Sequence, residues 1–158
     1  MRARLRLFVS AGPDMEAERE AIGKALAALP VSLGWVIKRT PRRGEPLAPA
    51  LEMVEQCDFY VLLMGYDITA PVGVEWMAAQ RTQRTVLAFL KRVPHTPAAQ
   101  IFIHHTRVKW TSFADAQELG SLLQRSLAIH ILERAADYGL SALERKNLSS
   151  LVEGTAEE

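Results

Sequence analysis

Glu75 is the residue whose setting in this sequence most favours chemistry. It follows the loop of residues 66–73, and that loop comes directly after the apolar run Phe59–Met64. In open α/β sheets, ligands bind just beyond the carboxyl ends of the strands, and this spacing predicts such a position for Glu75. A carboxylate there is able to act as a general base, as a nucleophile or as a ligand for a hydroxyl group. The alternative interpretation is a glutamate in the first turn of a helix, stabilised by the helix dipole.

Three residues next to Glu75 complete this candidate site. Gly65 ends the apolar run, and the loop after it consists of turn-forming residues. Tyr66 and Trp76 would supply aromatic walls, since an apolar cleft with a few polar groups suits a nucleoside or a ribose. A residue at a sheet edge lies outside the core, so Glu75→Gln is expected to change the free energy of unfolding by no more than about 0.5 kcal/mol.

Ser10 and Asp14 form a second polar group near the N-terminus. Residues 4–10 alternate between polar and apolar side chains, which predicts a strand that ends at Ser10. If this strand lies beside the run that precedes Glu75, both polar groups face the same cleft. The alternative for Asp14 is a structural role as the N-cap of the helix that follows.

The basic residues of the N-terminal half also allow two interpretations. Four of them lie in one loop with proline and glycine: Lys38, Arg39, Arg42 and Arg43. Such a loop either contacts phosphates or is a solvated surface loop. Arg19, predicted on a helix, is expected to pair with Glu16 or Glu20 at the surface.

Metal chemistry finds little support in the sequence. His104 and His105 are adjacent, so on a strand they point to opposite faces. His95 and His130 have no partner at a spacing typical of metal ligands. The chain also lacks a Walker phosphate loop, a GxGxxG fingerprint and a GxSxG nucleophile elbow. We therefore expect no metal and no resident cofactor.

Length, charge and composition narrow the class of protein. The chain has 158 residues, 49% of them hydrophobic, which suits one domain with a proper core. Its net charge of +1 gives no electrostatic case for binding nucleic acid or an anionic membrane. The single cysteine, Cys57, excludes an internal disulfide and suits a reducing compartment. Because no apolar segment approaches the length of a membrane span, a cytoplasmic protein is expected.

Apolar runs and amphipathic segments alternate along the chain. Strands are predicted over residues 4–10, 33–37, 59–64, 85–90 and 106–110, while residues 98–104 fit either a short helix or an edge segment. This alternation predicts an α/β three-layer sandwich with a central parallel sheet. The flavodoxin-like order 2-1-3-4-5 fits best, with its switch point between the first and third strands. The loops of residues 10–14 and 65–75 would then face each other.

The C-terminal part is predicted to be helical. A long helix over residues 113–138 carries an apolar stripe wider than one sheet edge needs. Part of that stripe either packs on a second copy, which would give a homo-oligomer, or simply covers the sheet. Because Gly139 ends the helix, the main domain is expected over residues 1–138. Residues 139–158 would form a helical extension with a frayed tail.

Two segments of the sequence resemble the DUF4062 family, which is TIR-like and also similar to nucleoside deoxyribosyltransferases. The first is RLFVSAGPDMEAERE, residues 6–20, in which a strand ending in serine leads to an aspartate and a Glu–Arg pair. The second is CDFYVLLMGYDITAPVGVEWMAA, residues 57–79, followed by RTVLAFLK, residues 84–91. The resemblance covers roughly residues 4–91 and implies a TIR-like fold.

This resemblance implies two alternative functions. In catalytic members of those wider groups, a glutamate on the matching helix attacks or stabilises the ribosyl carbon as an N-glycosidic bond breaks, and Glu75 matches it. NAD, a related nucleotide or a nucleoside would be the substrate. The predicted cleft would bind it through Ser10, Asp14, Gly65, Tyr66 and Trp76. The other implied function is a non-catalytic signalling or defence module that self-associates, binds a nucleotide and works with a larger signalling or defence protein. The sequence leaves open whether the chain is an enzyme.

Overall fold

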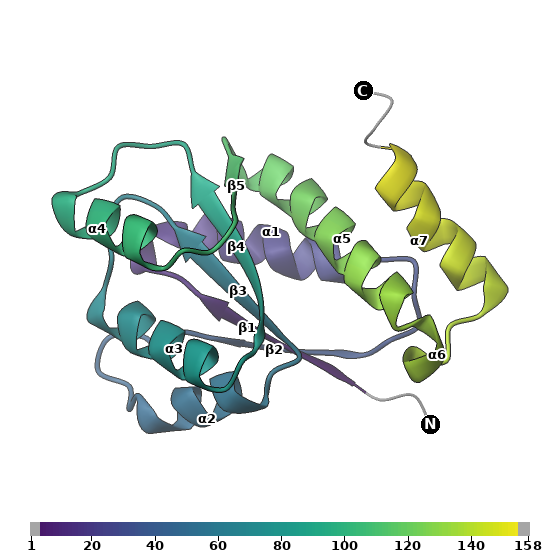
Figure 1. The fold of residues 1–158 in the computed structure, drawn as a ribbon, viewed down its shortest axis with the longest axis horizontal. Coiled ribbons are helices and arrows are strands. Elements are labelled where there is room, and N and C mark those ends of the chain that lie inside the picture. Colours follow the sequence, from purple (N-terminus) through teal and green to yellow (C-terminus); the bar gives the residue numbers. More distant parts are fainter. Residues whose placement is uncertain (1–3, 155–158) are drawn as a thin grey trace.

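The computed structural model describes residues 4–154, which form a five-stranded sheet between two layers of helices (Figure 1). The strands are β1 (Leu5–Ser10), β2 (Trp35–Arg39), β3 (Phe59–Met64), β4 (Thr85–Lys91) and β5 (Trp110–Phe113). Their order is β2-β1-β3-β4-β5, and each neighbouring pair is parallel. The predicted α/β sandwich with strand order 2-1-3-4-5 is confirmed.

Helices cover both faces of the sheet. On one face lie α1 (Glu16–Ala27), α5 (Ala116–Glu133) and α7 (Ala142–Gly154), with the short α6 (Ala135–Tyr138) between the last two. On the other face lie α2 (Ala48–Gln56), α3 (Ala70–Arg81) and α4 (Pro97–His105). A 3-10 turn, Pro13–Met15, leads from β1 into α1.

The central strand β3 is buried along its whole length, as its uninterrupted apolar sequence predicts. Its side chains alternate between the two layers. Phe59 and Leu63 join the core under α1 and α5, while Tyr60 and Leu62 join the core under α2 and α3. Phe8 of the neighbouring strand stacks on Tyr60 with ring centroids 6.1 Å apart. These contacts fix β1 and β3 as the centre of the molecule.

The last strand lies later in the chain than predicted. Residues 98–104, which fitted two structures, belong to helix α4, whose N-cap Thr96 accepts a hydrogen bond from the Ala99 amide. The helix continues to His105, so the segment of residues 106–109 serves as the connection. The predicted strand at 106–110 is therefore wrong, and β5 begins at Trp110, whose indole donates to the Ile103 carbonyl.

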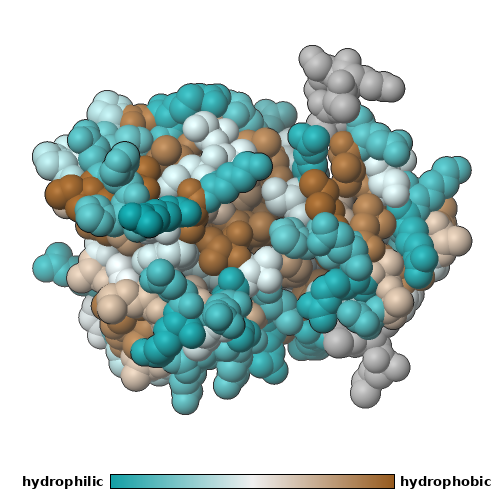
Figure 2. Space-filling view, in the orientation of Figure 1, coloured by the Kyte–Doolittle hydropathy of each residue, from teal (hydrophilic) through white to brown (hydrophobic). Residues whose placement is uncertain are grey.

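The predicted helix over residues 113–138 is shorter and divided. It begins at Ala116 with Asp115 as its N-cap, and at Arg134 the backbone leaves the helical region, with φ −119° and ψ 32°. Gly139, at φ +62°, then ends α6 in the left-handed conformation that glycine adopts without strain. The wide apolar stripe of α5 packs largely against α1 and α7. Figure 2 shows further apolar atoms at the surface between α5 and α7. Self-association through this helix stays a prediction.

The helix α7 contributes to the main core, because Leu148 is fully buried there. The predicted division at residue 138 stays a prediction, and the predicted frayed tail at 155–158 lies outside the described residues. No helix within residues 4–154 is long and apolar enough to cross a membrane. Within the same range, no group of three or more His, Cys, Asp or Glu side chains is arranged to hold a metal ion.

Candidate functional site

Glu75 lies at the carboxyl-terminal edge of the sheet, where three segments meet. Helix α3 begins at Ala70, so Glu75 is in its second turn and not, as predicted, in its first. The side chain is fully buried, with 0% exposure. Its Oε1 accepts hydrogen bonds from Ser10 Oγ at 2.6 Å and from Thr40 Oγ1 at 2.7 Å. One carboxylate thereby ties the last residue of β1 and the residue after β2 to α3.

Thr40 connects the end of β1 to Glu75 through three hydrogen bonds. Its amide donates to the Val9 carbonyl at 3.1 Å, which continues the sheet register past β2. Its hydroxyl accepts from the Ala11 amide at 3.1 Å while donating to Glu75. Thr40 was not among the predicted site residues, because the second strand was predicted to end at residue 37. With β2 ending at Arg39, Thr40 lies at the same edge of the sheet as Ser10, the last residue of β1.

Burial makes Glu75 harder to ionise than a solvent-exposed glutamate. Burial raises the pKa of Glu75 above the ordinary value of 4.5, and hydrogen bonds from Ser10 and Thr40 and the charge of Arg19 oppose that rise. Its second oxygen, Oε2, is buried and has no hydrogen-bond partner among the described residues. The Tyr60 hydroxyl is also buried, and burial raises the pKa of Tyr60 while the neighbouring Ser10 hydroxyl opposes that rise. Glu75 Oε2 therefore still has the capacity to accept a hydrogen bond.

The raised pKa of Glu75 predicts how stability depends on pH. The folded protein retains a proton on Glu75 at pH values where the unfolded chain has released it, so ionisation opposes folding. We expect the free energy of unfolding of the wild type to fall, relative to Glu75→Gln, as pH rises above 4.5 towards the folded-state pKa. Chemical denaturation of both proteins at a series of pH values measures the difference. Two curves that run parallel across this range would contradict the prediction.

The two loops at the switch point face each other, as the strand order predicts. Asp14 Oδ2 accepts a hydrogen bond from the Tyr66 amide at 3.3 Å. A Cβ on Gly65 would lie 2.7 Å from Asp14 Oδ2 and 2.9 Å from Met15 Sδ, so any larger residue here would displace these two side chains. The alternative role of Asp14 as an N-cap is wrong, because α1 has Met15 at that position and no side-chain cap.

The remaining predicted site residues do not surround Glu75. The Tyr66 side chain is 58% exposed, so it is available to a ligand at the surface. Trp76 is buried with Tyr60, at 6.3 Å between ring centroids, and lines a hollow between α3 and α4. Ser10 thus contacts Glu75, Asp14 and Gly65 lie in the neighbouring loops, and Trp76 faces the other way. The functional roles of all six residues stay predictions.

A cavity of about 580 Å³ opens at the same sheet edge. Thr40 lies on its wall, together with Thr69 and Pro71 from the start of α3. Its basic residues are Arg19, Arg39, Arg42 and Arg43. Three of these come from the loop predicted either to contact phosphates or to be solvated. Arg19 pairs with Glu16, as predicted, but its side chain is only 9% exposed and also donates to the Ala11 carbonyl at the end of β1.

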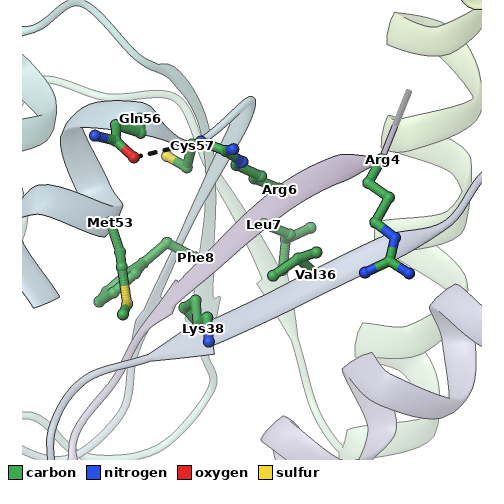
Figure 3. A pocket seen from close by; sticks show the side chains of 9 residues that line it. All are labelled: Arg4, Arg6, Leu7, Phe8, Val36, Lys38, Met53, Gln56 and Cys57. Carbon is green, nitrogen blue, oxygen red and sulfur yellow. Dashed lines mark hydrogen bonds between the residues drawn. The ribbon is translucent and has the colours of Figure 1, made fainter.

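A second cavity, of about 610 Å³, lies over the earlier part of β1 and against α2 (Figure 3). Arg6 donates to Gln56 Oε1 there at 3.3 Å, and Phe8 and Met53 form its apolar side. Lys38 of the predicted basic loop lines this cavity, but Glu75 and its five predicted partners do not. The cavity beside Thr40 is the one that adjoins the buried carboxylate, so we take it as the candidate site.

The comparisons with known proteins support the fold. A CMP N-glycosidase of Clostridium botulinum, BcmB, has a similar structure, with a TM-score of 0.51 and 14% sequence identity. The similarity covers 75% of this chain and 97% of that protein. No protein-family model and no curated protein matches the sequence. The chain therefore has a fold of the kind found in an N-glycosidase, and the DUF4062 resemblance stays a prediction.

Proposed function

We propose that this protein cleaves the N-glycosidic bond of a nucleoside or nucleotide, with Glu75 as the catalytic carboxylate. The observation that carries this proposal is the Glu75 site. One carboxylate oxygen is held by two hydroxyl donors, and the other has no hydrogen-bond partner within residues 4–154. It adjoins a cavity large enough for a small ligand at the edge where α/β sheets bind ligands. The similar fold of a CMP N-glycosidase agrees with this reaction class.

The chemistry requires a negative charge near the sugar. When the bond between C1′ and the base nitrogen breaks, C1′ develops positive charge, and a carboxylate stabilises it or attacks it. Water then supplies a hydroxyl group to C1′ and a proton to the departing base. Ser10 and Thr40 would hold Glu75 in one orientation for this step, since both donate to the same oxygen. Thr40 lies on the cavity wall, so substrate would approach the carboxylate past its hydroxyl.

Direct measurement of free base tests this proposal. Purified protein is incubated with CMP, cytidine, AMP or NAD, and cytosine, adenine or nicotinamide is separated by chromatography. Dilute and concentrated samples are both needed, because activity that depends on self-association would emerge only in the second. Release of one base above the protein-free rate is the expected result. Absence of every base from both samples would contradict the proposal.

The second candidate is a non-catalytic TIR-like module that binds a nucleotide, self-associates and serves a larger signalling or defence protein. The complete burial of Glu75 and Ser10 favours it, because a carboxylate closed off from solvent also serves to tie β1, β2 and α3 together. Under this alternative, a nucleotide would bind and change the sedimentation of the protein, while no base would be released.

A further inference from the structure

Two arginines in the cavity beside Thr40 are bridged by a single carboxylate. Glu16 Oε1 accepts from Arg19 Nη1 at 2.6 Å and from Arg39 Nη2 at 2.7 Å. All three side chains line the cavity. Glu16 is 52% exposed, whereas Arg19 is 9% exposed and Arg39 is 34% exposed. A half-exposed carboxylate therefore lies over two more buried guanidinium groups.

The two guanidinium groups have more donors than Glu16 uses. Arg19 also donates to the Ala11 carbonyl, which fixes its side chain against the end of β1. The Nε atoms of Arg19 and Arg39 are both buried and have no partner among the described residues. Arginine is rarely buried without full pairing, because each unpaired donor costs free energy. The Glu16 carboxylate therefore leaves some hydrogen-bond donors of Arg19 and Arg39 unpaired.

The electrostatics of the pair also favour an anion with more charge. Burial lowers the pKa of Arg19, and the positive charge of Arg39 lowers it further. Hydrogen bonds from Arg39 and Arg19 hold the pKa of Glu16 below its ordinary value. Two cations held this close repel each other, and a single carboxylate compensates only part of their charge. A phosphate group carries up to two negative charges and three acceptor oxygens.

We infer that Glu16 occupies the position of a phosphate group, and that this cavity binds phosphate monoesters whose phosphate displaces Glu16 from Arg19 and Arg39. Arginine suits this role, because its planar fork of donors matches phosphate oxygens. Arg42 and Arg43 add positive charge to the same wall. This inference rests on the proposed function for its substrate class: the ligand is a nucleotide and not a nucleoside.

Binding measurements with two matched pairs of variants test the inference. Titration calorimetry with CMP, cytidine and inorganic phosphate is applied to the full chain and to Arg39→Met and Glu16→Gln. Lys38→Met is the control for Arg39→Met, because Lys38 is the neighbouring cation on β2 and lines the cavity of Figure 3 instead. Glu55→Gln is the control for Glu16→Gln, because it removes a carboxylate that pairs with Arg81 outside the cavity.

The expected results differ in direction between the variants. Arg39→Met should weaken CMP binding by about tenfold or more, the scale of losing hydrogen bonds to a charged group. Glu16→Gln should tighten CMP binding, because it removes the carboxylate that competes with phosphate for the two arginines. The gain should be only about fivefold, because exposed ion pairs contribute little free energy. Cytidine binding should not change in either variant, and the controls should bind CMP as the wild type does. Inorganic phosphate should follow the pattern of CMP.

Two results would overturn the inference: equal affinity of the wild type for CMP and cytidine, or weaker CMP binding by Glu16→Gln. The outcome is separate from that of the base-release assay. Preferential CMP binding with the expected variant pattern but no released base would leave the phosphate site intact and remove the glycosidase. Release of base together with equal binding of CMP and cytidine would support the glycosidase and remove the phosphate site.

Discussion

Glu75→Gln is expected to lower base release by on the order of a hundredfold or more, the usual effect of losing a charged group that stabilises a transition state. The amide keeps the size of the side chain and one oxygen to accept from Ser10 and Thr40. It removes the negative charge that would stabilise the positive charge developing on C1′. The rate of base release under saturating substrate, normalised to folded protein, is the quantity to compare.

The matched control for this variant is Glu55→Gln. It makes the same chemical change in a carboxylate that pairs with Arg81, and Glu55 does not line the cavity beside Thr40. If Glu75→Gln does not fold, Thr40→Val removes only one hydroxyl donor and should lower the rate by about tenfold. Unchanged rates in a folded Glu75→Gln protein, or in Thr40→Val if that substitute is needed, would remove this carboxylate from the mechanism.

Leu62→Asp is expected to prevent folding. Leu62 is fully buried in β3, and an aspartate there would lose the apolar contacts and leave a buried charge without a partner. The combined cost is about 4 kcal/mol or more, a large part of the 5–15 kcal/mol that stabilises a typical domain. Circular dichroism and urea unfolding measure the result.

The control for Leu62→Asp introduces the same charge at an exposed apolar position. Met77 on α3 is 66% exposed, so Met77→Asp should shift the free energy of unfolding by no more than about 0.5 kcal/mol. A Leu62→Asp protein that unfolds at the wild-type urea concentration would show that β3 is not the central strand.

The core of the fold was predictable because its pattern is local. The apolar run Phe59–Met64 coincides with β3. A continuous apolar run of that length in an α/β domain is typical of a strand buried on both faces. The strand order then brought Ser10 towards Glu75. The start of β5 was not predictable in the same way. The β-branched Thr106 and Val108 alternate with Arg107 and Lys109 as in a half-buried strand, and only the full length of α4 excludes these residues from the sheet.

The candidate site was only partly predictable because it depends on contacts between distant segments. Thr40 reaches Glu75 through the register of β2 on β1, and β2 begins two residues later than its apolar pattern predicts. The burial of Glu75 follows from the same packing. This burial overturns the premise that Glu75 lies outside the core, so the small stability change expected for Glu75→Gln from the sequence no longer follows.

The hydrogen bonds of Glu75 have a consequence for the kinetics of folding. They join Ser10 and Thr40 to a residue that lies 65 and 35 positions later in the chain. Contacts of such separation form only after long loops have closed, which slows the folding of α/β domains relative to helical ones. During refolding, strand β1 must remain without its β3 neighbour until the chain has collapsed around both. The carboxylate would therefore become hydrogen-bonded late, and the appearance of ligand binding would follow, not precede, the formation of helical structure.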